Sequence, residues 1–508
     1  MSENLAAGAR IVKSAGLSGL SGFEVLVETS IANGLPVFLI VGLPDSAVRE
    51  ARDRVRAVVR NLGFDFPMKR ILVNLAPADT RKEGPLYDLP IALGLLVASG
   101  QLGAVPDDTI FAGELSLDGG LRPVAGVLPM ALSVRDAGAR HMFVPADNAS
   151  EAALADGLNV YPARHISEII EHLRGGAGIA PAGVYAAPAD LERYPDFADV
   201  RGQETTRRAI EVAVSGAHNI LLSGTAGGGK SMMAKRVPSI LPPMDRDEMI
   251  ESTAIHSIAG MTERGSPLLL RRPFRSPHHT VSSSGMAGGG RLPKPGEMSL
   301  AHNGVLFLDE FPEFHRDVLE CMRQPMEDGQ VTITRANGSF TYPSRFMLVC
   351  AMNPCKCGWH GHHSGRCACS EESVRRYLGR ISGPILDRID IFAAVPPVEY
   401  DELSGGRAGE PSADIRRRVA AARKRQAARQ GAPNAQLTNA QLREFCPIGG
   451  DGEKLMKAAY EKLDLSARAY SRILKVARSI ADLSSSDRIE CEHLAEAIQY
   501  RNMCVKEL

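Results

Sequence analysis

The stretch that decides the fold is NILLSGTAGGGKSMMAKRV, at residues 219–237. It joins an apolar run typical of a buried strand to a glycine-rich loop and then to a segment with helical periodicity. The loop at 224–231 matches the pattern GxxxxGK[ST] in the strand–loop–helix context that a phosphate-binding loop (P-loop) requires. A glycine-rich turn before a helix is the alternative, but the strand in front of it favours the phosphate site.

Each part of this loop has a physical role in binding a nucleoside triphosphate. Glycines let the backbone amides turn toward the β-phosphate, and the helix that follows presents its positive end. Lys230 can reach the β- and γ-phosphates, and the hydroxyl of Ser231 can bind magnesium. The sequence therefore predicts that ATP and Mg²⁺ are held by Gly224, Thr225, Ala226, Gly227, Gly228, Gly229, Lys230 and Ser231.

Two later strands also end in polar residues. GVLFLDEF delivers Asp309 and Glu310, and RFMLVCAMN delivers Asn353. Ligands of parallel sheets bind at the carboxyl ends of the strands, so we expect these side chains to lie beside the phosphates. Asp309 would hold magnesium, Glu310 would orient or deprotonate the attacking water, and Asn353 would hold that water against the γ-phosphate. For Asn353, a plain strand-ending turn is the alternative.

Length and composition bound the remaining choices. A chain of 508 residues is too long for one core. Lys plus Arg equals Asp plus Glu, at 59 each, so any charged binding surface must be local. The apolar runs near the N-terminus are too short for a membrane span or a signal peptide, which predicts a cytoplasmic protein without a membrane partner.

Changes in periodicity along the chain indicate the domain organisation. Alternating β-rich and helical segments predict an α/β domain at 1–175, and a Gly-, Ala- and Pro-rich stretch at 176–195 is typical of a linker. Strands separated by helical patterns predict a parallel sheet wrapped by helices at 196–397. Helical periodicity dominates the remainder, so 398–508 is expected to be all-helical.

Several segments together resemble the ComM/YifB family of magnesium-chelatase-like AAA+ ATPases over essentially the whole chain. They are DFADVRGQETTRRAIEVAVSGAHNILLSG, FRSPHHT, GEMSLAHNGVLFLDEFPEF, CAMNPCKCG, LDRID and LSARAYSRILKVARSIADL. The resemblance implies a Lon-protease-like N-terminal domain, an AAA+ core and a helical C-terminal lid. It also implies a ring, expected to be a homohexamer, that acts on single-stranded or branched DNA as a branch-migration helicase in recombination or natural transformation.

The resemblance also implies roles for individual residues. Asn353 is the sensor-1 residue, Arg388 is the arginine finger that reaches a neighbouring subunit's ATP, and Arg468 is the sensor-2 arginine of the lid. Val200 and Gln203 would lie near the adenine. An ATPase that remodels a protein or a metal-insertion partner, as in magnesium chelatase, is the alternative function.

The Lon-like N-terminal domain raises a third function, ATP-dependent proteolysis. Lon-type enzymes need a serine shortly after a Gly-Pro and a lysine further along to activate it. The serine position in KEGPLYDLP is Leu86, and the lysine position in LRPVAGVLPMAL falls near Leu128. Neither leucine can act as a nucleophile or a base, so we expect the fold without the protease chemistry.

A cysteine-rich stretch, NPCKCGWHGHHSGRCACS, follows the strand that ends in Asn353. Cys355, Cys357, Cys367 and Cys369 form two CxC pairs, which can surround one ion in the tetrahedral arrangement that zinc prefers. The stretch thus predicts a structural Zn²⁺ site, because a loop with little core of its own can be fixed by a metal. Free or redox-active cysteines are the alternative, and His360, His362 or His363 could replace a cysteine.

Candidate DNA contacts are weaker signals. The segment QVTITRANGSFTYP has Asn-Gly between alternating strands and predicts a hairpin carrying Arg335. Lys294 precedes it in RLPKPGE, and both cations could grip phosphates without reading bases. The basic segment at 416–429 could bind DNA, but a solvated face of the lid explains it as well.

Overall fold

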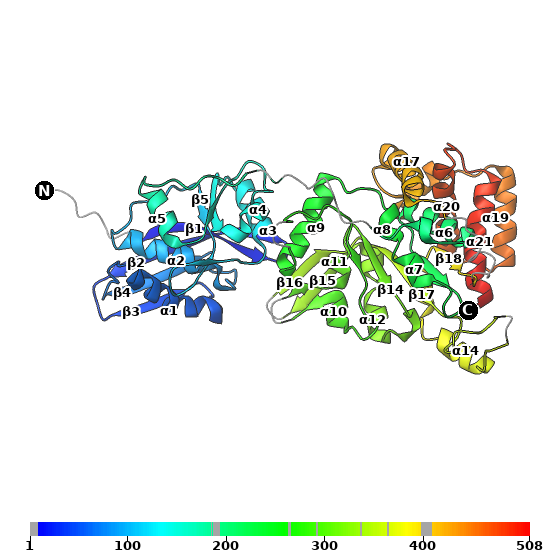
Figure 1. Ribbon diagram of the computed structural model, residues 1–508, viewed down its shortest axis with the longest axis horizontal. Coiled ribbons are helices and arrows are strands. Elements are labelled where there is room, and N and C mark those ends of the chain that lie inside the picture. Colours follow the sequence, from blue (N-terminus) through cyan, green and yellow to red (C-terminus); the bar gives the residue numbers. More distant parts are fainter. Residues whose placement is uncertain are drawn as a thin grey trace. The chain divides into compact units, whose positions relative to one another are not determined.

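The computed structural model describes residues 9–183, 185, 194–262, 266–290, 293–335, 338–362, 365–397 and 409–507, with 502–507 described by their backbone only. The chain divides into two compact units (Figure 1). Met1–Pro188, Arg246–Leu270 and Ala336–Thr341 form the first unit, and the rest forms the second. The domain boundaries predicted from the sequence stay predictions, and two segments from the middle of the chain belong to the first unit.

The first unit is built on a mixed sheet of seven strands in the order β3-β4-β2-β1-β5-β8-β9. Antiparallel pairs join β1 to β2 and β2 to β4, whereas the remaining neighbours are parallel. The strands are β1 (Arg10–Ser18), β2 (Ser21–Ala32), β3 (Val37–Val41), β4 (Arg70–Ala76), β5 (Thr109–Phe111), β8 (His141–Pro145) and β9 (Asn159–Ala163). Two short strands, β6 (Glu114–Leu115) and β7 (Leu121–Arg122), form a separate hairpin.

Helices complete the core of the first unit. Helix α2 is the most apolar of them and packs on β1 and β2, while Asp45 caps α1 by accepting a hydrogen bond from the N–H of Val48. The helices are α1 (Ser46–Asn61), α2 (Asp88–Ala98), α3 (Val127–Asp136), α4 (Ala149–Ala152) and α5 (Ile166–Leu173). Short 3₁₀ turns, η1 (Pro85–Tyr87) and η2 (Ala146–Asn148), precede α2 and α4.

A helix from the middle of the chain belongs to this unit. Helix α9 (Arg246–Ala259) packs on α3, and the backbone N–H of Gly126 donates to the carbonyl of Ser257 at 3.1 Å. The Ser257 hydroxyl also donates to the buried carboxylate of Glu151. The insertion between the P-loop and the strand of Asp309 thus contributes to the core of the first unit.

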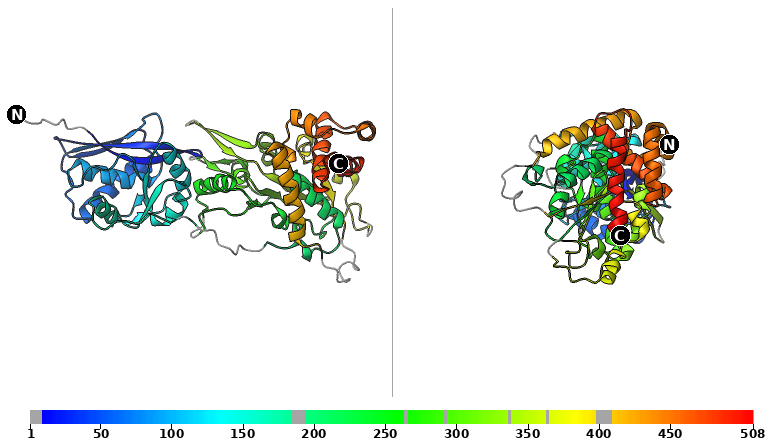
Figure 2. Two further views of the ribbon diagram at one scale, coloured as in Figure 1. Left: turned by 90° about the horizontal axis from the view of Figure 1, so that it is seen from above. Right: turned by 90° about the vertical axis from the view of Figure 1, so that its right-hand side faces the viewer.

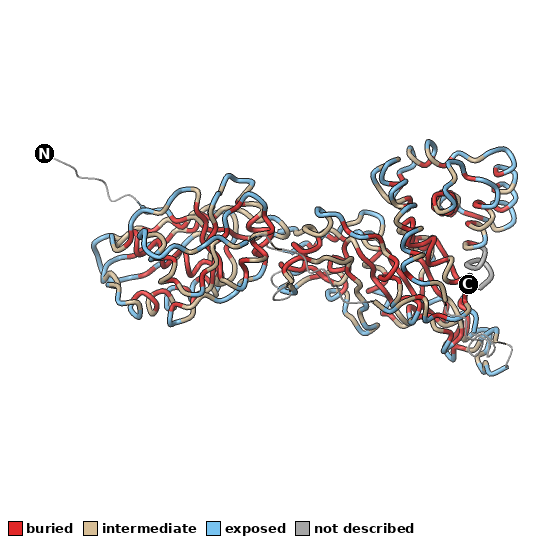
Figure 3. The backbone as a smooth tube through the Cα atoms, turned by 45° about the horizontal axis from the view of Figure 1, so that its top comes forward, coloured by how far each residue is buried: buried red, intermediate tan, exposed pale blue. Residues whose placement is uncertain are grey.

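The second unit contains a parallel sheet of five strands in the order β11-β14-β17-β10-β18. The strands are β10 (Ile220–Ser223), β11 (Phe274–Arg275), β14 (Val305–Leu308), β17 (Met347–Met352) and β18 (Ile391–Ala394). β14 and β17 are buried throughout, as expected for central strands covered on both faces (Figure 3). This arrangement confirms the predicted α/β class with a P-loop core.

Short elements surround this sheet. Near the P-loop they are η3 (Phe197–Asp199), α6 (Glu204–Gly216), α7 (Lys230–Ala234) and α8 (Val237–Ile240). Further along they are α10 (Ser283–Ala287), β12 (Gly288–Gly289), β13 (Lys294–Pro295), α11 (Glu297–Leu300), η4 (Phe311–Glu313), α12 (Arg316–Cys321), α13 (Pro325–Asp328), α14 (Glu371–Leu378) and α15 (Gly383–Leu386). β15 (Gln330–Arg335) and β16 (Gly338–Pro343) form the predicted two-stranded sheet, although Asn337 lies outside the described residues.

The described C-terminal region is helical, as predicted, and gathers at one end of the second unit (Figure 2). Its elements are α17 (Ser412–Gln430), η5 (Asn434–Gln436), α18 (Asn439–Phe445), α19 (Gly450–Lys462), α20 (Ala467–Leu483) and α21 (Cys491–Glu507). α17 and α20 both pack on α6, so the helical region shares one core with the sheet.

Candidate functional site

The P-loop joins β10 to α7 at the carboxyl edge of the parallel sheet. Gly227 and Gly229 have φ angles of +77° and +85°, which L side chains rarely adopt. Gly229 caps α7, whose first residue is Lys230. The glycines predicted for backbone freedom therefore stand where the loop turns into the helix.

Lys230 folds back over the loop that precedes it. Its Nζ donates to the carbonyl oxygens of Gly224 and Thr225, at 2.7 and 2.8 Å, and to Oδ1 of Asn353 at 2.9 Å. Burial lowers the pKa of Lys230, while the charge of Asp309 opposes this change. Asn353, which directly follows β17, therefore lies beside the P-loop lysine, where a γ-phosphate sensor is needed.

Asp309 directly follows β14 and contacts the P-loop at Ser231. The hydroxyl of Ser231 donates to Oδ2 of Asp309 at 2.5 Å. A hydroxyl beside a carboxylate is the oxygen donor set that Mg²⁺ prefers, so these residues fit the metal that accompanies a nucleoside triphosphate. Glu310 has a left-handed backbone, with φ of +52°, and its side chain is 58% exposed.

One neighbour of Glu310 was not predicted from the sequence. Nδ1 of His279 lies 3.4 Å from Oε2 of Glu310, close enough for an ion pair when the imidazole is protonated. His279 follows β11, the two-residue edge strand that pairs with β14. The histidine belongs to the FRSPHHT segment, but no local signal could show which strand this segment joins.

The two residues expected near the adenine lie between η3 and α6: Val200 directly follows η3, and Gln203 directly precedes α6. Val200 is fully buried, and Gln203 is buried in a left-handed conformation with φ of +53°. Nε2 of Gln203 donates to the carbonyl oxygens of Gly228 and Pro396, at 2.7 and 2.9 Å. Gln203 thus supports the P-loop directly, and adenine contact stays a prediction.

The two predicted arginines lie elsewhere. Arg388 is 7% exposed, and its guanidinium pairs with Glu327 of the same chain at 2.6 Å. Arg468 is exposed in the first turn of α20. Among the described residues, no hydrogen bond or ion pair joins either arginine to Lys230 or Asp309.

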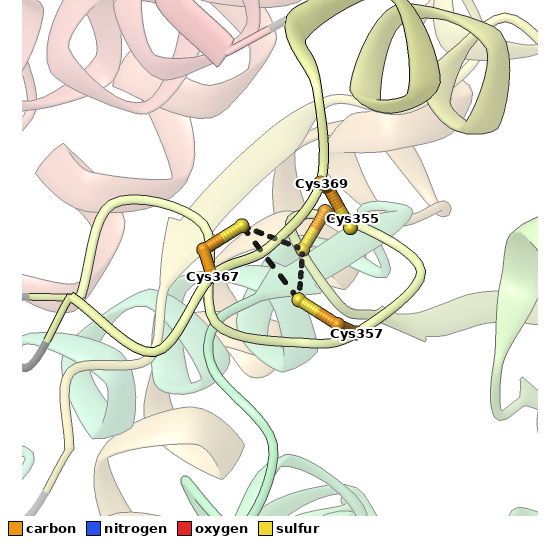
Figure 4. Close-up of side chains that lie close together, drawn as sticks. All are labelled: Cys355, Cys357, Cys367 and Cys369. Carbon is orange, nitrogen blue, oxygen red and sulfur yellow. Dashed lines mark hydrogen bonds between the residues drawn. The ribbon is translucent and has the colours of Figure 1, made fainter.

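The four clustered cysteines come together as predicted (Figure 4). Their sulfur atoms all lie within 4.8 Å of one another, and Sγ of Cys355 is 3.3 Å from that of Cys357 and 3.8 Å from that of Cys367. A hydrogen bond with the backbone of Trp359 lowers the pKa of Cys357 to about 6, whereas burial and the neighbouring cysteines raise the pKa of Cys367 to about 11, so the metal-free cluster favours one thiolate at Cys357. Four sulfur donors at this spacing fit Zn²⁺ without a histidine, and His363 lies outside the described residues.

The candidate DNA contacts lie on three elements, of which two are neighbours: Lys294 pairs with Gly289, and the guanidinium of Arg335 lies beside the same glycine. Lys294 and Arg335 are both exposed, on β13 and β15. Within α17, Arg418 pairs with Glu211 and Glu410, and Arg429 pairs with Asp482. These ion pairs give part of the basic segment a structural role, which neither the DNA-binding nor the solvated-lid interpretation predicted.

The positions that would carry a Lon-type dyad are buried in the first unit. Leu86 lies in η1 and is 7% exposed, and Leu128 is fully buried in α3. Both leucines contribute apolar packing where the protease chemistry would need a serine and a lysine.

Comparison with known families gives three matches that together cover most of the chain. The family described as "Magnesium chelatase, subunit ChlI" matches residues 196–403. Those described as "Subunit ChlI of Mg-chelatase" and "Magnesium chelatase, subunit ChlI C-terminal" match residues 27–148 and 409–501.

In the part of the chain that the structure describes, no helix is long and apolar enough to cross a membrane.

Relatives named YifB and ComM match nearly end to end, whereas Lon protease matches over a shorter stretch. YifB of Escherichia coli K12 is 43% identical over 495 residues, which are 97% of this chain and 96% of YifB. Competence protein ComM of Haemophilus influenzae is 42% identical over 500 residues, or 97% of each chain. Lon protease of Mycolicibacterium smegmatis is 27% identical over 166 residues, 30% of this chain and 21% of Lon. With this coverage and a P-loop site of the expected geometry, the chain belongs to the ComM/YifB family of magnesium-chelatase-like AAA+ ATPases.

Proposed function

We propose that the protein is an ATP-hydrolysing ring motor that acts on DNA, as a branch-migration helicase in recombination or natural transformation. The observation that carries the ATPase part is the meeting of three strand ends at the P-loop. Lys230 donates a hydrogen bond to Asn353, and Ser231 donates one to Asp309, so residues that follow β10, β14 and β17 share one site. Family membership supports ATPase activity independently.

Each residue of this site has a distinct task in phosphoryl transfer. The ammonium group of Lys230 neutralises the β- and γ-phosphates, and Ser231 and Asp309 hold magnesium. Magnesium, when bound, neutralises charge that develops on the phosphate oxygens. Glu310 orients the attacking water and accepts its proton, while Asn353 reports whether the γ-phosphate is present.

Arg388 and Arg468, which lie outside the P-loop, are proposed to assist ATP hydrolysis. Arg468, at the start of α20, would act as sensor 2 from the lid, and Arg388 would act on the ATP of a neighbouring subunit. Action in trans requires a ring, which we propose is a homohexamer. The Arg388–Glu327 pair would have to open for the guanidinium to leave its own chain.

The DNA part of the proposal rests on the relatives. One relative over nearly the full length is named a competence protein, and competence concerns the uptake of DNA. A motor that moves along any sequence should hold the phosphate backbone, for which the exposed Lys294 and Arg335 are candidates.

The cysteine cluster is proposed to bind one structural zinc ion. Elemental analysis of protein purified without chelators should find about one zinc per chain, since four thiolates close a tetrahedral shell. Replacement of Cys355 and Cys367 by serine should remove it. An undiminished zinc content in that double variant would reject the site.

ATP hydrolysis in the presence and absence of a branched DNA tests the proposed function. Wild-type rings should hydrolyse ATP faster with the junction, and the DNA affinity should fall steeply with salt because phosphate contacts release counterions. The Lys230→Ala variant should show no hydrolysis under either condition.

A chelatase-type ATPase that remodels a protein or metal-insertion partner is the second candidate. It is favoured by the descriptions of the three matched families, all of which name magnesium chelatase. Hydrolysis that DNA leaves unchanged, in rings verified as assembled, would select this alternative. ATP-dependent proteolysis is opposed by Leu86 and Leu128, and measured cleavage of an unfolded protein would revive it.

A further inference from the structure

The segment 353–358 contacts the P-loop at both of its ends. At one end, Oδ1 of Asn353 accepts a hydrogen bond from Lys230 at 2.9 Å. At the other end, the carbonyl oxygen of Gly358 accepts a hydrogen bond from the backbone N–H of Ala226 at 3.1 Å. Lys230 and Ala226 both belong to the P-loop, so a change of backbone conformation within 353–358 must disturb the loop.

Glycine is needed at position 358 for two reasons. Its φ of +82° lies in the left-handed region, and an added Cβ would lie 2.8 Å from Cβ of Ala226. Gly361, three residues later in the same loop, has a φ of +73°, but nothing lies within 4 Å of an added Cβ. Gly358 alone of these two glycines therefore combines a left-handed backbone with close approach to the P-loop.

Two of the four clustered cysteines lie between the anchors of this segment. Cys355 is fully buried, and its carbonyl oxygen accepts a hydrogen bond from the N–H of Gly358 at 3.0 Å, which closes a tight turn. Cys357 immediately precedes Gly358, and its Sγ lies 3.6 Å from that of Cys367 across the loop (Figure 4). A metal bound by the cluster would therefore hold the turn that presents the Gly358 carbonyl to Ala226.

The C-terminal end of the cysteine loop, at Cys369, leads into a helix that contacts Asn353. Cys369 is followed by Ser370, which caps α14 by accepting a hydrogen bond from the N–H of Ser373 at 3.2 Å. Tyr377 of that helix is buried, and a hydrogen bond links it to the backbone of Asn353. The cluster thus lies between two elements that both contact Asn353 or the P-loop.

We propose that Gly358 is a positioning residue that couples metal occupancy of the cysteine cluster to ATP affinity. Zinc on the four thiolates fixes the 355–358 turn, and the turn fixes Ala226 and so the loop whose amides receive the phosphates. Loss of the metal frees the turn, and the P-loop must then be ordered by the nucleotide itself, which weakens binding. This inference rests on the proposed ATP and zinc sites and adds the dependence of one on the other.

The first test compares ATP affinity in the zinc-loaded protein with that after removal of zinc by a chelator. Binding of a fluorescent ATP analogue should weaken by about tenfold, the cost of about one hydrogen bond, and titrated zinc should restore it. Circular dichroism checks that the chelated protein is still folded. Equal affinities in folded protein with and without zinc would overturn the coupling, whereas failure of zinc-loaded protein to bind ATP would overturn the ATP site itself.

The second test needs no metal removal and has a matched control. Gly358→Ala should weaken ATP binding by about tenfold while zinc content stays at the wild-type level, since the cysteines are intact. Gly361→Ala imposes similar backbone strain in open space and should leave ATP affinity unchanged. Equal affinities for the two variants would overturn the role of Gly358, as would a loss of zinc in Gly358→Ala that accounts for the weakened binding.

Discussion

At the scale of single residues, the proposed ATP site assigns nucleotide binding and hydrolysis to different residues. Lys230 and Ser231 belong to the loop that we propose receives the phosphates, whereas the carboxylate of Glu310, the proposed base, is exposed. Burial lowers the pKa of Lys230. The ammonium group of this lysine must nevertheless stay charged to bind phosphate. Substitutions at these positions should therefore fail at different steps.

We expect Lys230→Ala to abolish ATP binding and Glu310→Gln to retain binding while hydrolysis is lost. Removal of the lysine takes away the cation that faces the phosphates, and the glutamine cannot accept a proton from water. Binding is measured with a fluorescent nucleotide and hydrolysis by phosphate release. Hydrolysis at the wild-type rate by Glu310→Gln would show that another residue activates the water.

His279 should orient Glu310. Its imidazole lies 3.4 Å from the carboxylate, and its loss leaves an exposed side chain with more freedom. His279→Ala should lower kcat by about tenfold, equivalent to about 1.4 kcal/mol, with ATP affinity unchanged. His278→Ala is the control, because it removes the ring that packs on His279, with centroids 4.1 Å apart, but not the group that faces Glu310. A similar kcat for both variants would contradict the role of His279.

At the scale of elements, a buried charge cluster joins the lid to the sheet. Asp390, just before β18, pairs with Arg472 of α20, and its Oδ2 accepts a hydrogen bond from the N–H of Asn219 at 2.9 Å. Burial would raise the pKa of Asp390, but the charge of Arg472 is the main cause that outweighs it and places the pKa below its ordinary value. This contribution to stability is present above the ordinary pKa and is lost as the pH falls through the lower pKa of the folded protein.

Asp390→Ala should destabilise the second unit by about 3 kcal/mol, because it leaves the half-buried guanidinium of Arg472 and the N–H of Asn219 without their partner. Asp451→Ala is the control, since the Asp451–Lys454 pair is exposed, at 83% and 81%, and should matter little. Chemical denaturation followed by circular dichroism measures both. Equal stability of the two variants would contradict a structural role for the Asp390 cluster.

Much of the fold and of the candidate site could be predicted from the sequence, for a different reason in each element. Lys230, Asp309 and Asn353 follow apolar strands, so the rule that parallel strands present their carboxyl ends at one edge of the sheet was enough to predict that they meet. The four cysteines are close in sequence, which made their cluster foreseeable. The partners of Gly358 and His279 were missed because both contacts join segments distant in sequence, and β11 is only two residues long. The inclusion of α9 in the first unit also depends on long-range packing that no local periodicity encodes.

At the scale of the whole molecule, the proposed ring explains why the chain carries an arginine that is not used at its own P-loop. Arg388 is buried and paired with Glu327, so its release would accompany contact with a neighbouring subunit. A transferred arginine finger changes the rate of phosphoryl transfer by about 10³ to 10⁵. Hydrolysis should therefore depend on assembly.

Mixing two inactive variants tests action in trans. Arg388→Ala subunits keep an intact P-loop, and Lys230→Ala subunits keep an intact arginine, so mixed rings contain some complete interfaces. ATP hydrolysis should recover partly in the mixture, relative to either variant alone. No recovery, in rings confirmed as mixed, would show that Arg388 does not act on a neighbouring subunit.

The central claim is that ATP hydrolysis drives movement along DNA, and one fluorescence assay of junction migration tests it most directly. A three- or four-stranded junction carries a donor and a quencher that separate when the branch point moves. Wild-type rings should separate them in the presence of ATP and Mg²⁺, and Lys230→Ala rings of the same size should not. Absence of ATP-dependent strand movement by assembled wild-type rings that hydrolyse ATP would contradict the claim.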